Sequence, residues 1–150
     1  MRISKRMPPR TPSQGPQLRV LFVDDNPMTV KLAGYLFAEA GWRMDGFTSP
    51  LQALEALRHF EPDLIVTDFR MPEMSGPEFL LAAEQLHELT PKMVLTAYDD
   101  EECVQSVLRK AGVPALSKTL GLTELIARAH ELVSVRRSVK GKCLLADQRW

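Results

Sequence analysis

The chain has 150 residues, of which 45% are apolar and 25% are charged, and its formal net charge is zero. This length allows one domain of ordinary size, and the composition excludes the disordered, collagenous and membrane classes. The charge is segregated, because residues 1–17 hold four basic and no acidic side chains and residues 136–150 hold five basic and one acidic. Residues 18–135 keep 10 basic and 18 acidic side chains, which is a net charge of −8.

The sequence lacks the signatures of several functional classes. No apolar run approaches the roughly 18 residues of a membrane-spanning helix, and the polar, proline-rich start is unlike a secretory signal, so we expect a cytoplasmic protein with no membrane partner. Cys103 and Cys143 lie 40 positions apart and the three histidines are scattered, which predicts neither a disulfide framework nor a zinc site. Glycine-rich phosphate loops, a nucleophile elbow and an HExxH motif are absent from the sequence.

Ordered structure is predicted to begin at Leu18, after a disordered, basic and proline-rich extension over residues 1–17. From there short apolar runs alternate with helical patterns, which indicates βαβ units around a parallel sheet. Four of the five runs are almost continuously apolar, as is typical of strands covered on both faces. The predicted strands are residues 19–23, 43–47 (the weakest), 63–67, 92–96 and 113–117.

Five helices are predicted, one after each strand. The third opens with Ser75 and Glu78 at capping-box spacing and Pro77 in the first turn, and the fourth ends at Gly112, a residue suited to a helix end. The apolar positions are Met28, Leu32, Leu36 and Ala40 in the first helix, Leu51, Leu54, Leu57 and Phe60 in the second, Phe79, Leu80, Ala83 and Leu86 in the third, Val104, Val107, Leu108 and Ala111 in the fourth, and Leu122, Leu125, Ile126, Ala129, Leu132 and Val133 in the fifth.

This order of elements predicts an α/β domain over residues 18–135, a (βα)5 doubly wound, five-stranded parallel sheet with helices on both faces. Residues 136–150 have no clear period and are expected to form a basic C-terminal tail. The tail is either solvated or a docking segment that uses Cys143-Leu144-Leu145 and Trp150, and the sequence leaves both interpretations open.

Charged and hydroxyl side chains follow four of the five predicted strands. Asp24 and Asp25 follow the first, Asp68 the third, Thr96 ends the fourth and Lys118 follows the fifth. Because ligands of such folds bind outside the carboxyl ends of the strands, we expect these side chains at one site. Taken alone, each of these side chains could have a purely structural role. The Asp25-Asn26-Pro27 segment could cap a helix. Asp68 could be an ordinary acid in a turn, Thr96 a β-branched strand residue and Lys118 a surface lysine.

Three neighbouring carboxylates repel one another, which implies a cation. All-oxygen ligands without His or Cys favour Mg²⁺, which binds one or two carboxylates together with the phosphate oxygens of a substrate. Thr96 and Lys118 would then stabilise the oxygens of a transferring phosphoryl group, and Asp68 is the natural acceptor.

At these residues the chain resembles the receiver domain of two-component response regulators (CheY-like). The resemblance covers residues 18–135 and is carried by VLFVDDNP (20–27), DLIVTDFRMPEMSG (63–76), VLTAY (94–98) and the SK at 117–118. It implies a flavodoxin-like strand order, 2-1-3-4-5. It also implies that Met71-Pro72 and Gly76 shape the loop after the acceptor.

The resemblance assigns a role to each site residue. Asp68 matches the phosphoacceptor, Asp25 the direct Mg²⁺ ligand and Asp24 a ligand through water, and the backbone carbonyl of Arg70 would complete the metal ligands beside Asp68. Thr96 matches the hydroxyl that moves toward the acyl phosphate, and Lys118 the ammonium that binds it.

The chain departs from the receiver pattern next to the lysine. Receivers usually have a switching aromatic three positions before it, where this chain has Ala115, and Thr119 stands where proline is common. Tyr98, two positions beyond Thr96, is either a substitute for that aromatic or a residue that covers the site, and the sequence leaves both interpretations open. These departures suggest an atypical receiver with altered output switching.

The function that the resemblance implies is a signalling domain, not an enzyme with turnover. It would take a phosphoryl group from a sensor histidine kinase or a histidine phosphotransfer protein, in a self-catalysed reaction followed by autodephosphorylation, and would switch a surface for an unknown downstream protein. A homodimer is compatible with the family, although the departures lie on the face through which receivers often pair.

Two alternative functions would require residues or surfaces that this chain largely lacks. An aspartate-nucleophile phosphatase of the haloacid dehalogenase kind would carry a second Asp where this chain has Arg70. Nucleic-acid binding would rest on the basic ends alone, because residues 18–135 are acidic and contain no recognition-helix motif.

Overall fold

The computed structural model describes residues 2–3, 17–96, 109, 112–118 and 123–147, and the side chains of residues 17–96, 109, 112–118 and 124–136 among them. The strands are β1 (Arg2–Ile3), β2 (Arg19–Val23), β3 (Arg43–Phe47), β4 (Leu64–Asp68), β5 (Lys92–Thr96) and β6 (Ala115–Ser117). The helices are α1 (Pro27–Glu39), α2 (Pro50–Leu57), α3 (Gly76–Leu86) and α5 (Thr123–Asp147).

The strands form one sheet in the order β1-β3-β2-β4-β5-β6. The five strands from β2 to β6 are parallel, and their order confirms the predicted 2-1-3-4-5 arrangement. Each of the five parallel strands starts within two residues of its predicted start, whereas no strand was predicted at Arg2–Ile3. The predicted fourth helix falls almost wholly outside the described residues.

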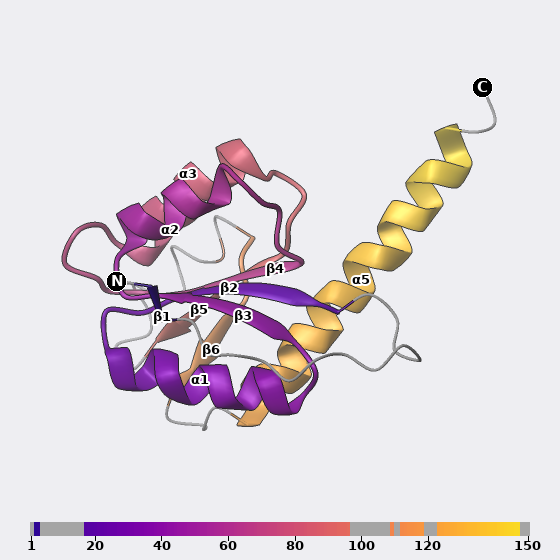
Figure 1. The fold of residues 1–150 in the computed structure, drawn as a ribbon. Coiled ribbons are helices and arrows are strands. Elements are labelled where there is room, and N and C mark those ends of the chain that lie inside the picture. Colours follow the sequence, from indigo (N-terminus) through magenta and orange to yellow (C-terminus); the bar gives the residue numbers. More distant parts are fainter. Residues whose placement is uncertain (1, 4–16, 97–108, 110–111, 119–122, 148–150) are drawn as a thin grey trace.

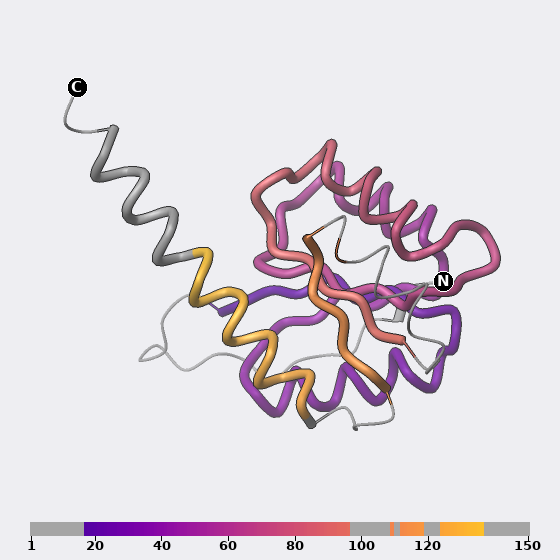
Figure 2. The backbone as a smooth tube through the Cα atoms, turned by 180° about the vertical axis from the view of Figure 1, so that it is seen from behind, coloured from indigo at the N-terminus to yellow at the C-terminus, as the bar shows by residue number. Residues whose placement is uncertain are grey.

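Helices cover both faces of the sheet (Figures 1 and 2). One face carries α1 and α5 over a core that includes Val20, Phe22 and Leu125, and the other carries α2 and α3 over a core that includes Leu21 and Phe79. Alternate residues of β2 therefore enter different cores, which explains why its sequence is apolar throughout.

Helix α1 buries a different face from the one that its apolar stripe suggested. Val30, Ala33 and Phe37 are fully buried against the sheet, whereas Met28 is 70% and Leu32 51% exposed. Both sets recur at helical spacing, so hydrophobicity alone did not distinguish them. The sheet buries the face on which Phe37 packs edge-on against Trp42. Of the predicted stripe, Met28 and Leu32 remain in solvent and Leu36 is half-buried.

Polar caps start the three shorter helices. The predicted cap of α3 is confirmed, because the backbone N–H of Glu78 donates to Ser75 Oγ at 3.2 Å. Asn26 and Ser49 accept in the same way from the first turns of α1 and α2, and each is followed by proline, which has no N–H to lose.

Both ends of the chain add to the five-stranded core. β1 pairs antiparallel with β3, so that Arg2 lies opposite Phe47. Helix α5 has 25 residues and continues to Asp147, through a segment in which the sequence showed no period. In the described residues no helix is long and apolar enough to span a membrane.

Candidate functional site

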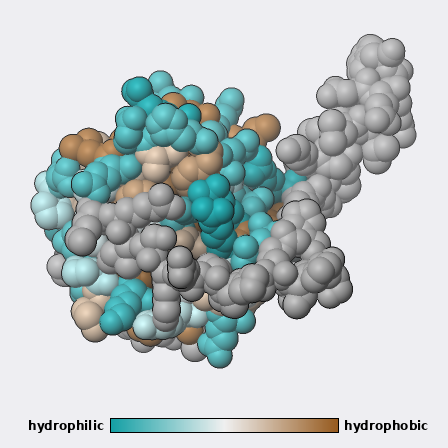
Figure 3. Space-filling view, viewed as in Figure 1, coloured by the Kyte–Doolittle hydropathy of each residue, from teal (hydrophilic) through white to brown (hydrophobic). Residues whose placement is uncertain are grey.

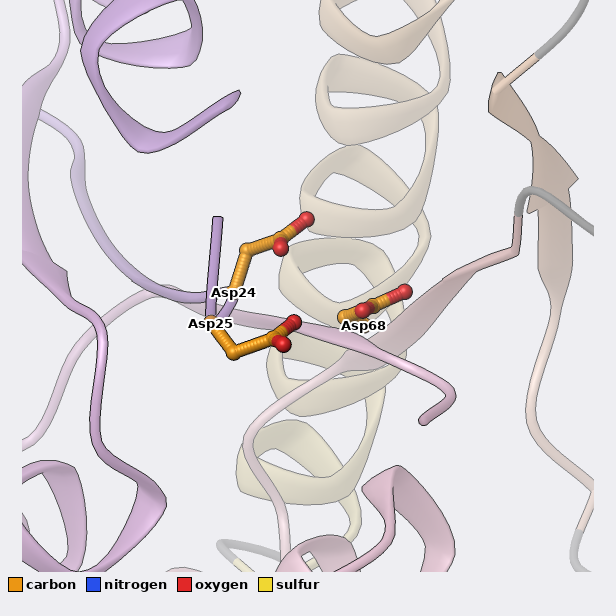
Figure 4. A group of neighbouring side chains, drawn as sticks. All are labelled: Asp24, Asp25 and Asp68. Carbon is orange, nitrogen blue, oxygen red and sulfur yellow. The ribbon is translucent and has the colours of Figure 1, made fainter. Parts of the chain in front are cut away.

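Three carboxylates meet at the carboxyl edge of the sheet (Figure 4). Asp24 and Asp25 follow β2 and Asp68 ends β4, and these strands are neighbours in the sheet. One carboxylate oxygen from each residue lies within 4.8 Å of those of the other two. Asp24 and Asp68 are buried and Asp25 is exposed, so the cluster opens to solvent on the side of Asp25.

Lys118 joins two of these carboxylates. Its ammonium group donates to Asp24 Oδ2 at 2.6 Å and lies 3.2 Å from Asp68 Oδ1. Lys118 follows β6, two strands away from β4, so only the assembled sheet brings the lysine to the acids. The predicted meeting of Asp24, Asp25, Asp68 and Lys118 at one edge is observed.

Two backbone N–H groups hold the carboxylates in place. Asn26 N donates to Asp24 Oδ1 and Phe69 N donates to Asp68 Oδ1, both at 2.9 Å. The sequence interpretation did not include these donors. The Asp24 contact spans two residues, which is the spacing of an Asx turn, so an Asp directly after a strand and two positions before the Asn26-Pro27 helix start was a usable signal for it.

The environment of Asp68 raises its pKa toward neutral pH. Burial and then the charge of Asp24 raise the pKa of Asp68 to about 6, against the opposing effects of Lys118 and the Phe69 N–H. Burial alone would lower the pKa of Lys118, but its hydrogen bond to Asp24 and the charges of Asp24 and Asp68 outweigh burial and raise that pKa. At neutral pH the site therefore contains an ammonium and a mostly ionised Asp68.

Thr96 lies at the same edge. It ends β5, one position beyond the residue that pairs with Asp68, and it is buried. Its strand partner is Ser117, next to Lys118, so β5 and β6 deliver a hydroxyl and an ammonium side by side. Ala115 packs half-buried against the core under α2 and α3, and Tyr98 lies outside the described residues.

Gly76 allows the start of α3 to approach the end of β4. Its N–H donates to Phe69 O at 2.8 Å, and a Cβ at this position would lie 2.2 Å from the backbone oxygen of Asp68. A side chain would therefore push α3 away from the strand that carries Asp68. Met71 is buried nearby and accepts a weak hydrogen bond from Thr67, whereas Arg70 is exposed in the same loop.

The donor set fits a hard divalent cation. The three carboxylates offer only oxygen, at the separation expected around one ion, and Lys118 offsets one of their three charges. The charge of Asp24 also contributes, after burial, to the raised pKa of Asp68. These residues suit Mg²⁺.

Comparisons with known proteins agree with this geometry. The family model of the response regulator receiver domain matches residues 20–130. The regulatory protein AtoC of Escherichia coli is 29% identical over 125 residues, which cover 81% of this chain and 27% of AtoC. An uncharacterized 14.6 kDa protein of Leptolyngbya boryana is 35% identical over 112 residues, covering 73% of this chain and 86% of that protein.

A solved structure supports the fold. The CheY-like response regulator receiver domain protein of Methanospirillum hungatei superposes with a TM-score of 0.76 at 20% identity, covering 82% of this chain and 98% of that one. The chain belongs to the response regulator receiver family, and it is a receiver domain of two-component signalling. It spans 27%, 8% and 24% of the lengths of the first three curated relatives.

Proposed function

We propose that this receiver domain accepts a phosphoryl group on Asp68 from a phosphohistidine donor. The observation that carries the proposal is the pairing of Asp68 with Lys118 in a cluster of three carboxylates. In the described residues both polar contacts of Asp68 end on Oδ1, which leaves Oδ2 to attack phosphorus. A P–O bond forms, the P–N bond to the donor imidazole breaks, and the released nitrogen takes a proton.

The surrounding residues would bind the charge of the transferring group. Asp24, Asp25, Asp68 and the carbonyl of Arg70 would hold Mg²⁺, which would neutralise negative charge on the acceptor and phosphoryl oxygens. Lys118 already faces Asp68 Oδ1 and would bind a phosphoryl oxygen as an ammonium. Thr96 would donate its hydroxyl to a second such oxygen, so that the domain catalyses its own phosphorylation and autodephosphorylation mainly by positioning charge.

Phosphorylation would change the surface presented to a downstream protein. The new dianion competes with Asp24 for Lys118, and Thr96 is drawn toward it on the adjacent strand. Since Ala115 replaces the usual aromatic, the change would be transmitted by movement of the loops around Thr96 and Tyr98. The donor would be a sensor histidine kinase or a histidine phosphotransfer protein, in keeping with the receiver family.

The test is phosphorylation with and without Asp68. We expect the full chain, incubated with Mg²⁺ and either phosphoramidate or a phosphorylated histidine phosphotransfer protein, to gain one phosphoryl group by intact mass. Asp68→Asn should lose at least 99% of this labelling, because an amide oxygen is a poor nucleophile, and chelation of Mg²⁺ should slow it strongly. Glu73→Gln, an exposed carboxyl in the loop after β4, is the matched control. Full labelling of Asp68→Asn would refute the assignment.

A further inference from the structure

A hydroxyl group lies inside the core under α2 and α3. Figure 3 shows hydrophilic residues among hydrophobic ones on the surface of the molecule, where polar groups contact water. Thr67, in contrast, is 0% exposed, and alternation along β4 places it on the same face as Ile65, in the core under those two helices. Burying a hydroxyl is unfavourable unless it forms a hydrogen bond, and valine would fill the same space without that requirement. The hydroxyl of Thr67 should therefore have a role of its own.

The hydroxyl of Thr67 binds the backbone of the proposed phosphoacceptor. It donates to the backbone oxygen of Asp68 at 3.0 Å, whereas the sulfur of Met71, a weaker acceptor, lies 3.9 Å away. Because a hydroxyl has one proton, its principal hydrogen bond is the one to Asp68. The same oxygen is crowded from the side of α3, since a Cβ at Gly76 would lie 2.2 Å from it. The backbone oxygen of Asp68 is therefore fixed between the Thr67 hydroxyl and the start of α3.

The position of this oxygen determines the direction of the next N–H group. The peptide bond between Asp68 and Phe69 is planar and trans, so its C=O and N–H groups point in opposite directions. The N–H of Phe69 lies 2.9 Å from Asp68 Oδ1 and 3.0 Å from Leu95 O, and it donates to both. A rotation of the peptide plane that moved the oxygen away from Thr67 would also move this N–H away from the carboxylate.

The direction of the Asp68 carboxylate thus depends on Thr67 through one peptide group. Oδ1 accepts from the Phe69 N–H and lies 3.2 Å from Lys118 Nζ. Because the two oxygens belong to one planar group, holding Oδ1 also fixes where Oδ2 points. The hydroxyl of Thr67 therefore contributes to the orientation of the oxygen that would attack phosphorus.

We propose that Thr67 is a positioning residue for phosphotransfer to Asp68. Its hydroxyl orients the Asp68–Phe69 peptide, the N–H of that peptide holds Oδ1, and Oδ2 is left aligned for the attack. This role rests on the proposed function of Asp68 as the phosphoacceptor. Thr67 is wholly buried and would touch neither the donor nor the cation. Loss of its hydroxyl should therefore slow the transfer step and leave donor binding unchanged.

Two substitutions at position 67 separate the hydroxyl from the volume of the side chain. Thr67→Val keeps the volume and removes the hydroxyl, whereas Thr67→Ser keeps the hydroxyl and removes a methyl group. With the full chain, Mg²⁺ and varied phosphoramidate, Thr67→Val should lower the maximal labelling rate about fivefold, as expected for one net hydrogen bond, at an unchanged half-saturating phosphoramidate concentration. Thr67→Ser should stay within about twofold of the wild-type rate. Urea unfolding would verify that both variants are folded.

A second measurement needs neither metal nor donor. In chelator, the amide proton resonance of Phe69 reports its hydrogen bond to Asp68 Oδ1, and it should shift in Thr67→Val and stay near the wild-type position in Thr67→Ser. The control is Thr90→Val, which removes another buried threonine hydroxyl, one that donates to Glu61 at 3.4 Å before the amino end of β5. Thr90→Val should change neither the labelling rate nor the Phe69 resonance.

Two results would overturn the positioning role of Thr67: labelling of Thr67→Val at the wild-type rate, or equal slowing in Thr67→Val and Thr67→Ser. A wild-type chain that gained no phosphoryl group on Asp68 would instead refute the proposed function. The Phe69 resonance in chelator would then still decide the contact, because an unmoved resonance in Thr67→Val overturns it and a shift that serine reverses supports it.

Discussion

Asp68 shows how one residue combines opposing requirements. The proposed phosphotransfer requires it to be ionised, yet its burial and the charge of Asp24 raise its pKa to about 6. Lys118 and the Phe69 N–H partly oppose that rise. The ionisation of Asp68 therefore depends on any cation that enters the site.

This balance predicts how stability depends on pH in a chelator. The pKa of Asp68 in the folded protein lies above the ordinary aspartate value of 3.8, so the folded state binds more protons than the unfolded state between about pH 4 and 6. The contribution of Asp68 to stability should fall as pH rises through that window. At pH 7 Asp68→Asn should be more stable than the wild type by about 1–2 kcal/mol after allowance for solvent screening, and the gain should shrink at pH 4.

Urea unfolding at several pH values in the presence of chelator measures this effect. Glu73→Gln, which changes an exposed carboxyl close to the site, should follow the wild-type curve. Parallel curves for the wild type and Asp68→Asn between pH 4 and 7 would contradict the prediction.

Helix α1 shows the limits of periodicity at the scale of an element. Two stripes of its sequence are apolar, and the sheet buries the one that contains Phe37. Its amino-terminal cap, Asn26, also donates its backbone N–H to Asp24. The helix therefore both covers a core and fixes a site carboxylate.

The two stripes should differ sharply in their effect on stability. Phe37→Ala removes a fully buried ring and should lower the free energy of unfolding by about 3–5 kcal/mol. Leu32→Ala, on the exposed stripe, should change it by less than about 0.5 kcal/mol. Chemical denaturation of both variants measures these changes. A large loss of unfolding free energy in Leu32→Ala alone would mean that the buried face of α1 had been wrongly identified.

At the scale of the whole molecule, the site depends on the complete sheet. Its acids follow β2 and β4 and its lysine follows β6, so a bound cation would link strands that are far apart in the sequence. Folding and metal binding should consequently be coupled.

This coupling predicts that Mg²⁺ stabilises the fold. At ten times its dissociation constant, Mg²⁺ should add about 1.4 kcal/mol to the free energy of unfolding, as linkage requires. The increase should be lost in Asp25→Asn, whose exposed carboxyl belongs to the cluster, and kept in Glu73→Gln. Thermal unfolding with and without Mg²⁺ is the measurement. An equal increase in Asp25→Asn would place the cation elsewhere.

The strand order 2-1-3-4-5 was implied only by the resemblance to receiver domains. The sequence by itself determined the five parallel strands and the meeting of Asp24, Asp25, Asp68 and Lys118 at one edge. These follow from local patterns, because continuous apolar strands require cover on both faces and parallel strands align their carboxyl ends. Tertiary structure alone decided which stripe of α1 is buried, which backbone N–H groups hold the carboxylates and that α3 starts against the end of β4. Each of these depends on contacts between elements, which no single segment encodes.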